Sequence, residues 1–151
     1  MEQKRANEDE EEGEQKTFLK CPFLPPSVNK CYMRFRRSVH LTSEAKKFKD
    51  NVAALCVGKK KVLGTVALYI RAHKQTARRW DVDNILKMII DGIQHRLIGD
   101  DSLVMRIVVE KIISLKTEPE GFELIVKQLT PPLPPQQPHK IKRNTKLKKN
   151  K

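Results

Sequence analysis

Residues 80–103 read WDVDNILKMIIDGIQHRLIGDDSL, an apolar run with acidic side chains at both ends. Apolar residues recur through it at the three- and four-residue spacing of one helix face: Leu86, Ile89, Ile90, Ile93 and Leu97. The Asp83 carboxylate can cap the free N–H groups of a first turn. Gly99 can end a helix in the left-handed conformation that other residues resist. The pattern therefore predicts a helix from Asp83 to Gly99.

Strand-like patterns lie on both sides of this helix. Apolar alternation or short apolar runs predict strands over residues 17–23, 62–73, 103–115 and 122–129. The last two are joined through Pro119-Glu120-Gly121 and predict a hairpin with a longer loop. A second helix is predicted after Thr42 or Ser43, with an apolar stripe of Ala45, Phe48, Val52 and Leu55. We therefore expect a mixed α/β domain, with a mixed sheet and two main helices.

The ends of the chain differ in composition from its middle. Residues 1–16 carry seven acids and three bases, whereas residues 131–151 are rich in proline and then in lysine. Neither segment has the apolar periodicity of a packed element, so both are predicted to be disordered tails. The predicted domain then occupies residues 17–130. The acidic segment could compete with DNA for a basic face, and the lysine-rich segment could add non-specific DNA affinity or act as a nuclear address.

The charge of the chain indicates a polyanionic partner. The net charge is +13, and the part between residues 17 and 138 carries +10 of it. Such an excess in the folded part favours nucleic acid over a membrane surface. Cys21, Cys31 and Cys56 form no metal-binding or disulfide pattern. With no signal peptide or long apolar run, we expect a soluble, intracellular protein with neither a membrane partner nor an organic cofactor.

The acidic residues around the first helix predict a metal site. In an extended segment Asp81 and Asp83 would point to the same side. If the strand after Asp100 and Asp101 lies beside the strand that precedes Asp81, a third carboxylate can join the pair. Three hard oxygen ligands suit Mg²⁺, or alternatively Mn²⁺. Each acidic residue alone also has a structural explanation, as a helix cap or a polar turn.

A lysine and a further aspartate continue the face that begins at Asp83. Lys87 follows it by four residues, and Asp91 comes one turn later. An ammonium group at this place can stabilise charge that develops on phosphate oxygens. Asn84 is expected to support the carboxylates by hydrogen bonding. The alternative is that Lys87 and Asp91 are only an exposed ion pair.

Basic residues in two segments are candidates for DNA contacts. Arg78 and Arg79 precede the first aspartate, and their guanidinium groups can hold phosphates. Trp80 has two interpretations, as a ring that stacks on unpaired bases at a branch point or as a core aromatic. A second basic segment, interrupted by aromatic residues and expected to form a hairpin rim, carries Lys30, Arg34, Arg36 and Arg37.

The ordered set of motifs resembles the RusA family of Holliday junction resolvases. The resemblance covers roughly residues 17–129 and rests on four segments: Leu24-Pro25-Pro26-Ser27-Val28-Asn29, Leu41-Thr42, Asp81-x-Asp83-Asn84-x-x-Lys87-x-x-x-Asp91 and Asp100-Asp101. The chain departs from many relatives at Trp80, where a basic residue or proline is common. The two charged tails are also additions to the family pattern.

The resemblance implies a homodimeric endonuclease that needs magnesium and makes paired symmetric nicks in four-way DNA junctions, in recombination and repair. It implies that Asp81, Asp83 and Asp101 bind the metal and that Lys87 is catalytically important. Asp100 is the second choice for the third ligand. The location implied is the cytoplasm or nucleoid of a bacterial or phage system, or the nucleus of a eukaryotic host.

Two other functions remain open from the sequence. A structure-selective nuclease could prefer other branched DNA, and the altered residue at Trp80 keeps this alternative open. A non-catalytic protein could retain the fold and the basic surface while binding junctions or other DNA. Loss of the acidic residues or of Lys87 would have favoured it, and all of them are present.

Overall fold

The computed structural model describes residues 14–75 and 80–131. Its strands are β1 (Lys16–Cys21), β2 (Tyr32–Phe35), β3 (Ser38–Leu41), β4 (Thr65–Lys74), β5 (Val104–Ile113) and β6 (Gly121–Thr130). Its helices are α1 (Ser43–Leu55) and α2 (Asp83–Ile93), with 3₁₀ turns η1 (Val28–Lys30) and η2 (Asp101–Leu103). The predicted fold class is confirmed. The predicted tails fall almost wholly outside the described residues.

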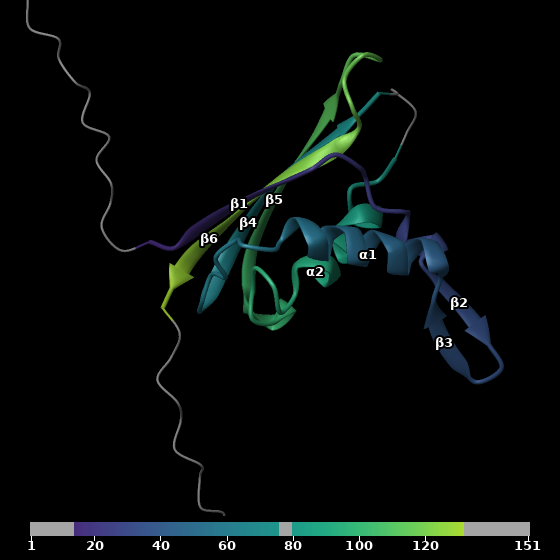
Figure 1. Cartoon of the computed structure of the whole chain (residues 1–151), viewed down its shortest axis with the longest axis horizontal. Coiled ribbons are helices and arrows are strands. Elements are labelled where there is room, and N and C mark those ends of the chain that lie inside the picture. The colour runs from purple at the N-terminus through teal and green to yellow at the C-terminus, as the bar shows by residue number, and fades with distance from the viewer. Residues whose placement is uncertain (1–13, 76–79, 132–151) are drawn as a thin grey trace, which may run out of the picture.

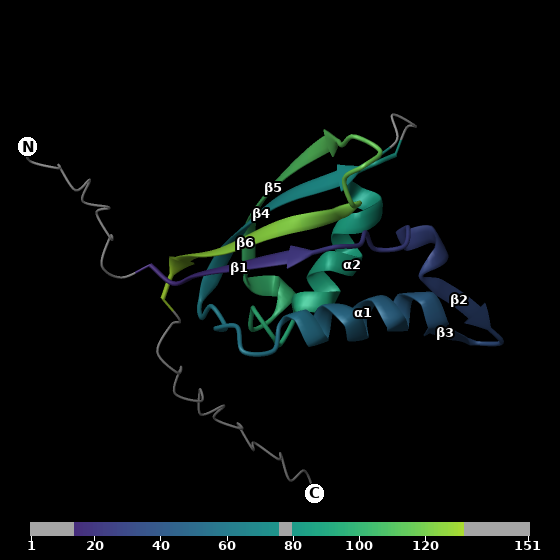
Figure 2. The ribbon, with the colours of Figure 1, turned by 45° about the horizontal axis from the view of Figure 1, so that its top comes forward.

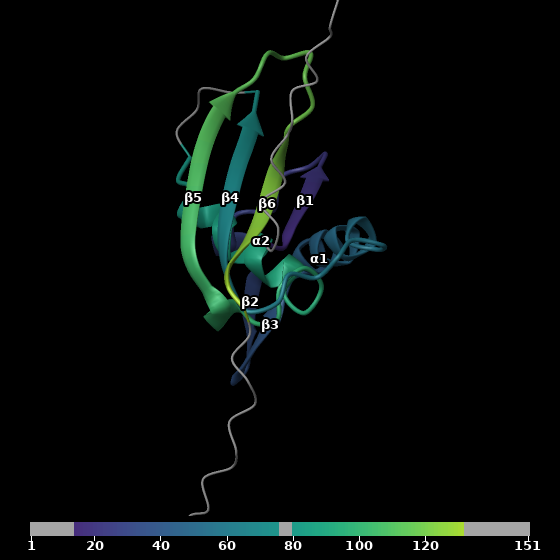
Figure 3. The same cartoon turned by 90° about the vertical axis from the view of Figure 1, so that its left-hand side faces the viewer.

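Four of the strands form one mixed sheet in the order β1-β6-β4-β5 (Figure 3). β6 is antiparallel to both of its neighbours, whereas β4 and β5 are parallel. Both main helices lie on the same face of this sheet (Figures 1 and 2). The two remaining strands, β2 and β3, form a separate antiparallel ribbon beyond the end of the sheet. The fold therefore has a two-layer body and one projecting ribbon.

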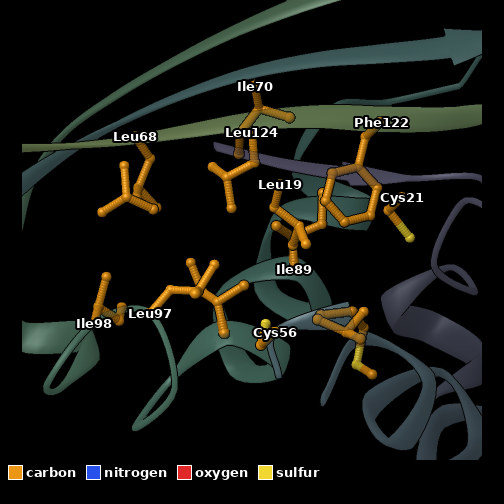
Figure 4. Close-up of a cluster of buried hydrophobic side chains, with 14 of the residues drawn as sticks. Leu19, Cys21, Cys56, Leu68, Ile70, Ile89, Leu97, Ile98, Phe122 and Leu124 are labelled. Atoms are coloured by element: carbon orange, nitrogen blue, oxygen red, sulfur yellow. The ribbon is translucent and has the colours of Figure 1, made fainter. Parts of the chain in front are cut away.

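The core fills the space between the sheet and the helices. Alternate residues of β4 and β6 point into it, including Leu68, Ile70 and Leu124, which are fully or almost fully buried. They face Ile89 of α2 and the residues that follow that helix (Figure 4). This packing is what the period-two pattern of a strand and the broad apolar stripe of a helix require.

The prediction for α1 is confirmed. The Thr42 hydroxyl accepts a hydrogen bond from the N–H of Ala45 at 3.3 Å, as a helix cap does. The apolar stripe predicted for this helix faces the core, with Phe48 and Val52 buried. The three cysteines are free and buried, which agrees with the absence of a disulfide pattern. Within residues 14–75 and 80–131, neither helix has the length and apolar character needed to cross a membrane.

The predicted start of α2 at Asp83 is confirmed, but its predicted cap and its predicted end are wrong. The helix begins at Asp83, but the capping residue is Val82 and no side chain caps the first turn. The helix ends at Ile93 rather than at Gly99, and His95 takes a positive φ of 63°. Leaving the helix lets the consecutive residues 97 and 98 both enter the core, and the carbonyl of residue 97 accepts the N–H of Val62 at 2.8 Å. A continued helix would have turned one of these neighbours away.

The predicted hairpin between the last two strands is also wrong. β6 pairs with β1 and β4, and β5 pairs with β4 alone. The chain from β4 through α2 to β5 is a crossover between parallel strands, which leaves β5 at the sheet edge. β5 exposes Arg106, Glu110 and Lys111, whereas β6 buries Leu124 and Val126. Charged residues suit an edge strand, and β6, which is far more buried than β5, takes the central place.

Candidate active site

A hollow of about 380 Å³ lies between α2 and the start of β5. Asp83, Lys87 and Asp91 line it from successive turns of α2. Asp101 lines it from η2, and Val104 and Ile107 form an apolar wall from β5. We call this space the acidic hollow. β5 lies beside β4, the strand that precedes Asp81, which meets the condition set in the sequence analysis, and the crossover returns Asp101 to the helix.

The Lys87 ammonium group in the acidic hollow has two polar neighbours, Asp91 and Tyr32. Lys87 Nζ lies 3.6 Å from Asp91 Oδ2, and the Tyr32 hydroxyl donates to the same oxygen at 3.4 Å. Asp91 is the main reason that the pKa of Lys87 is raised, with Tyr32 as the next cause. Burial raises the pKa of Tyr32, and Asp91 adds to this effect. The ammonium therefore stays charged, and the phenol stays protonated, at neutral pH.

Tyr32 was missed by the reasoning from sequence. It begins β2, 59 residues before Asp91, so no local spacing could link it to the site. The available signal was its place three residues after the motif that ends at Asn29, in a segment where basic and aromatic residues are mixed.

The two adjacent aspartates after α2 have different surroundings. Asp100 accepts hydrogen bonds from the Ser102 hydroxyl at 2.6 Å, the Ser102 N–H at 3.0 Å and Gln94 Nε2 at 3.1 Å. The bonds from Ser102 are the main reason that the pKa of Asp100 is lowered to about 2. Asp100 thus caps η2, whereas the exposed Asp101 lines the acidic hollow. This difference favours Asp101 over Asp100 as a ligand.

A second and larger hollow, of about 620 Å³, lies on another side of the first turn of α2. Asp81, Asn84 and Trp80 line it together with Phe48 of α1 and Pro26 of the preceding loop. The expected extended geometry at Asp81 and Asp83 is wrong, because Val82 between them already has helical angles, φ −63° and ψ −38°. The two carboxylates therefore line different hollows.

No group of three or more His, Cys, Asp or Glu side chains is gathered closely enough to hold a metal ion within the described ranges 14–75 and 80–131. Asp83 and Asp101 share the acidic hollow, and Asp81 stands apart from them. Asn84 contributes its backbone N–H to the carbonyl of Asp81 at 3.3 Å. Its side chain lines the larger hollow.

Trp80 packs against the core and is partly buried. The ammonium groups of Lys74 and Lys111 lie 5.4 and 5.3 Å from the centre of its ring. Lys111 Nζ also donates to the Trp80 carbonyl at 2.9 Å. These contacts favour the packing interpretation of Trp80, because a ring that wedges into DNA would have to leave them.

The other predicted DNA contacts fall into two groups. Lys30 lies in η1, and Arg34, Arg36 and Arg37 lie in the β2–β3 ribbon, all exposed. Arg78 and Arg79 lie outside the described residues. The structure therefore brings together Asp83, Lys87, Asp91 and Asp101, whereas the basic residues of the ribbon do not line the acidic hollow.

Comparisons with known proteins find similarity to one family. The family model described as "Endodeoxyribonuclease RusA" matches residues 22–120. A crossover junction endodeoxyribonuclease of Enterobacteria phage 82 is 33% identical over 72 residues, which cover 46% of this chain and 60% of the phage protein. The protein of the same name from Escherichia coli K12 is 32% identical over the same length and coverage. The chain thus spans about 60% of the length of these curated relatives.

Proposed function

We propose, since this chain belongs to the RusA family of endodeoxyribonucleases, that it is a metal-dependent nuclease that nicks four-way DNA junctions in recombination and repair. The observation that carries the proposal is the acidic hollow, which gathers Asp83, Lys87 and Asp101 from α2 and η2. The relatives named above are crossover junction endodeoxyribonucleases. The substrate proposed for this chain is accordingly branched DNA.

The proposed metal ligands are Asp81, Asp83 and Asp101, and the proposed ion is Mg²⁺, with Mn²⁺ as the alternative. A divalent metal ion is what the family resemblance of the acidic motifs implies. The residues fit such an ion in chemistry, because their carboxylate oxygens are hard ligands. Two of the three share one hollow, and all three are exposed, so packing does not block their rotation. When bound, the ion would lower the pKa of a water molecule and neutralise phosphate charge.

The side chains of the acidic hollow have distinct roles in this proposal. Lys87 donates to a non-bridging phosphate oxygen and stabilises the charge that develops there. Asp91 and Tyr32 orient the ammonium and keep it protonated. Val104 and Ile107 reduce the access of water on one side, which strengthens these charge interactions.

DNA is proposed to run from the acidic hollow toward the basic ribbon. Lys30, Arg34, Arg36 and Arg37 would contact its phosphates, and the exposure of these side chains supports this role. Arg78 and Arg79 would act beside Asp81. Trp80 would meet DNA at the larger hollow, which it lines together with Lys74, one of the two lysines beside its ring.

Paired nicks in a symmetric junction need two active sites, so we propose a homodimer. The edge strand β5 supports this proposal with exposed apolar side chains, including Met105, Val108 and Ile113. An unpaired strand edge with such residues is rare on a protein that stays alone. Replacing Met105 by arginine should halve the mass measured by light scattering if β5 forms the interface. An unchanged dimer mass would contradict this choice of surface.

The decisive experiment compares a labelled four-way junction with a matched linear duplex, with and without Mg²⁺. The full-length protein should make paired nicks in the junction only, and only with the metal. Asp83→Asn should abolish nicking and keep junction binding. Asp50→Asn is the matched control, because Asp50 is an exposed aspartate on α1 outside the acidic hollow.

Two outcomes would contradict the proposal in different ways. Nicking of flaps or forks in preference to junctions would make the protein a structure-selective nuclease of wider scope. Firm junction binding without nicks under Mg²⁺ or Mn²⁺ would make it a DNA-binding protein. In that case the protein would function with Asp81 separated from Asp83 and Asp101.

A further inference from the structure

The β2–β3 ribbon exposes apolar side chains that the domain does not cover. Phe35 is 64% exposed, Met33 54% and Val39 61%. In Figure 2 the ribbon extends beyond α1 and away from the sheet. Strand register places Met33 and Phe35 on one face of the ribbon and Val39 on the other. Large exposed apolar residues at the end of a projection indicate a surface that binds something.

The charge of this segment identifies the partner. From Lys30 to Ser43 the chain has four lysine or arginine residues and no acid. Arg36 lies with its guanidinium 5.4 Å from the centre of the Phe35 ring. An aromatic ring beside guanidinium groups is the combination that binds nucleic acid through base stacking and phosphate contacts. An apolar protein partner would not require this concentration of positive charge.

The turn of the ribbon carries a side chain where the backbone favours glycine. Arg36 and Arg37 connect β2 to β3, and Arg36 has a positive φ of 55°. This left-handed conformation has a steric cost for any residue with a Cβ. The Arg36 guanidinium lies over the Phe35 ring, which is itself exposed. A strained turn that keeps an arginine favours a role outside the fold.

The root of the ribbon is fixed to the acidic hollow. Tyr32, the first residue of β2, bonds Asp91, which in turn pairs with Lys87. On the other strand, the Thr42 N–H donates to the Cys31 carbonyl at 2.9 Å. Three strand steps separate Tyr32 from Phe35, or about 10 Å. The tip therefore lies beyond the root by roughly the length of three nucleotides along a DNA strand.

We propose that the ribbon is a wedge that inserts Phe35 at the branch point of DNA and stacks its ring on a base freed from pairing. Arg34, Arg36 and Arg37 hold the flanking phosphates. The inference rests on the proposed function for its substrate, branched DNA. A branch point suits this mode because its bases are already less well paired, so little unstacking energy is required. Phe35, rather than Trp80, then performs the wedge role.

The test uses the full-length protein, without metal, and a four-way junction with 2-aminopurine beside the branch point. Wild type should change the fluorescence of the probe, and Phe35→Ala should abolish the change and weaken junction binding about 10-fold. Phe35→Trp should restore both. Val57→Ala is the matched control, because Val57 is an exposed apolar residue after α1.

Three results would overturn the wedge. Phe35→Ala could leave the fluorescence change intact, or wild type could produce no change. The variant could also weaken binding to linear duplex as much as binding to the junction. The last result would mean that the ribbon contacts the groove of any DNA duplex and is not specific for a branch point. Because the probe is read without metal, failure of nicking by wild type would contradict the proposed nuclease while leaving this test valid.

Discussion

The acidic hollow and the β2–β3 ribbon differ in how the fold supports them. Asp83 and Lys87 stand on a helix whose opposite face packs on the sheet through buried residues such as Met88 and Ile89. The ribbon has only its root attached, and residues 33–40 are all exposed. Side chains on a rigid frame keep the geometry that chemistry requires. A ribbon attached at one end can adapt to the shape of a nucleic acid.

The largest effect is expected from Lys87→Ala. Removing a charge that stabilises a phosphate in the transition state should lower the nicking rate about 100- to 1,000-fold, or roughly 3–4 kcal/mol. Junction affinity should fall much less. Single-turnover nicking and a gel-shift assay measure the two quantities. Loss of binding equal to the loss of rate would mean that Lys87 only attracts DNA.

The next prediction compares how much the two-layer body and the ribbon contribute to the free energy of unfolding. Leu124→Ala leaves a cavity at a fully buried position and should lower the free energy of unfolding by about 2–5 kcal/mol. Phe35→Ala should change it by less than about 0.5 kcal/mol, because that ring is largely exposed. Urea denaturation measures both. A large loss for Phe35→Ala would mean that the ribbon packs against the body.

A smaller effect is expected from Tyr32→Phe, which removes the hydroxyl that joins ribbon and hollow. Loss of one hydrogen bond costs about 0.5–1.5 kcal/mol, so nicking should fall about 3- to 10-fold. Tyr32 helps to raise the pKa of Lys87, so the variant should lose activity at a lower alkaline pH than wild type. A rate loss with an unchanged pH profile would assign Tyr32 a purely structural role.

Arg36→Gly should sharpen the difference between ribbon stability and ribbon function. Glycine relieves the left-handed backbone, so the free energy of unfolding should rise by up to about 1 kcal/mol. Junction affinity should fall a few-fold, because a phosphate contact is lost. His95→Gly is the control, since it has a similar φ of 63° but lies outside the ribbon. Equal or better junction affinity for Arg36→Gly would remove Arg36 from the DNA contacts.

The smallest effect concerns Asp100. Hydrogen bonds from Ser102 are the main reason that its folded-state pKa is lowered to about 2, below the ordinary value for aspartate. The resulting stabilisation is present above about pH 4 and is lost as the pH falls through the folded-state value. Ser102→Ala should move the carboxyl midpoint, followed by NMR, back toward the ordinary value. An unchanged midpoint would contradict the assigned hydrogen bonds.

The sequence by itself determined local features of the helices and which acidic residues are candidates for the site. The Thr42 cap and the apolar stripe of α1 were readable because helix ends and helix faces depend on residues a few positions apart. The same is true of the spacing that places Asp83, Lys87 and Asp91 on one face of α2. The ordered motifs also identified the family that the comparisons support.

Only the tertiary structure decided how these elements combine. The central place of β6 depends on a crossover and on which strand can be buried on its inner face, neither of which is a local property. The end of α2 at Ile93 goes together with a contact distant in sequence, the hydrogen bond from the Val62 N–H to the carbonyl of residue 97. The link from Tyr32 to Asp91 arises from a contact between segments 59 residues apart in the chain. Periodicity reports which side of an element is apolar, and packing decides what that side meets.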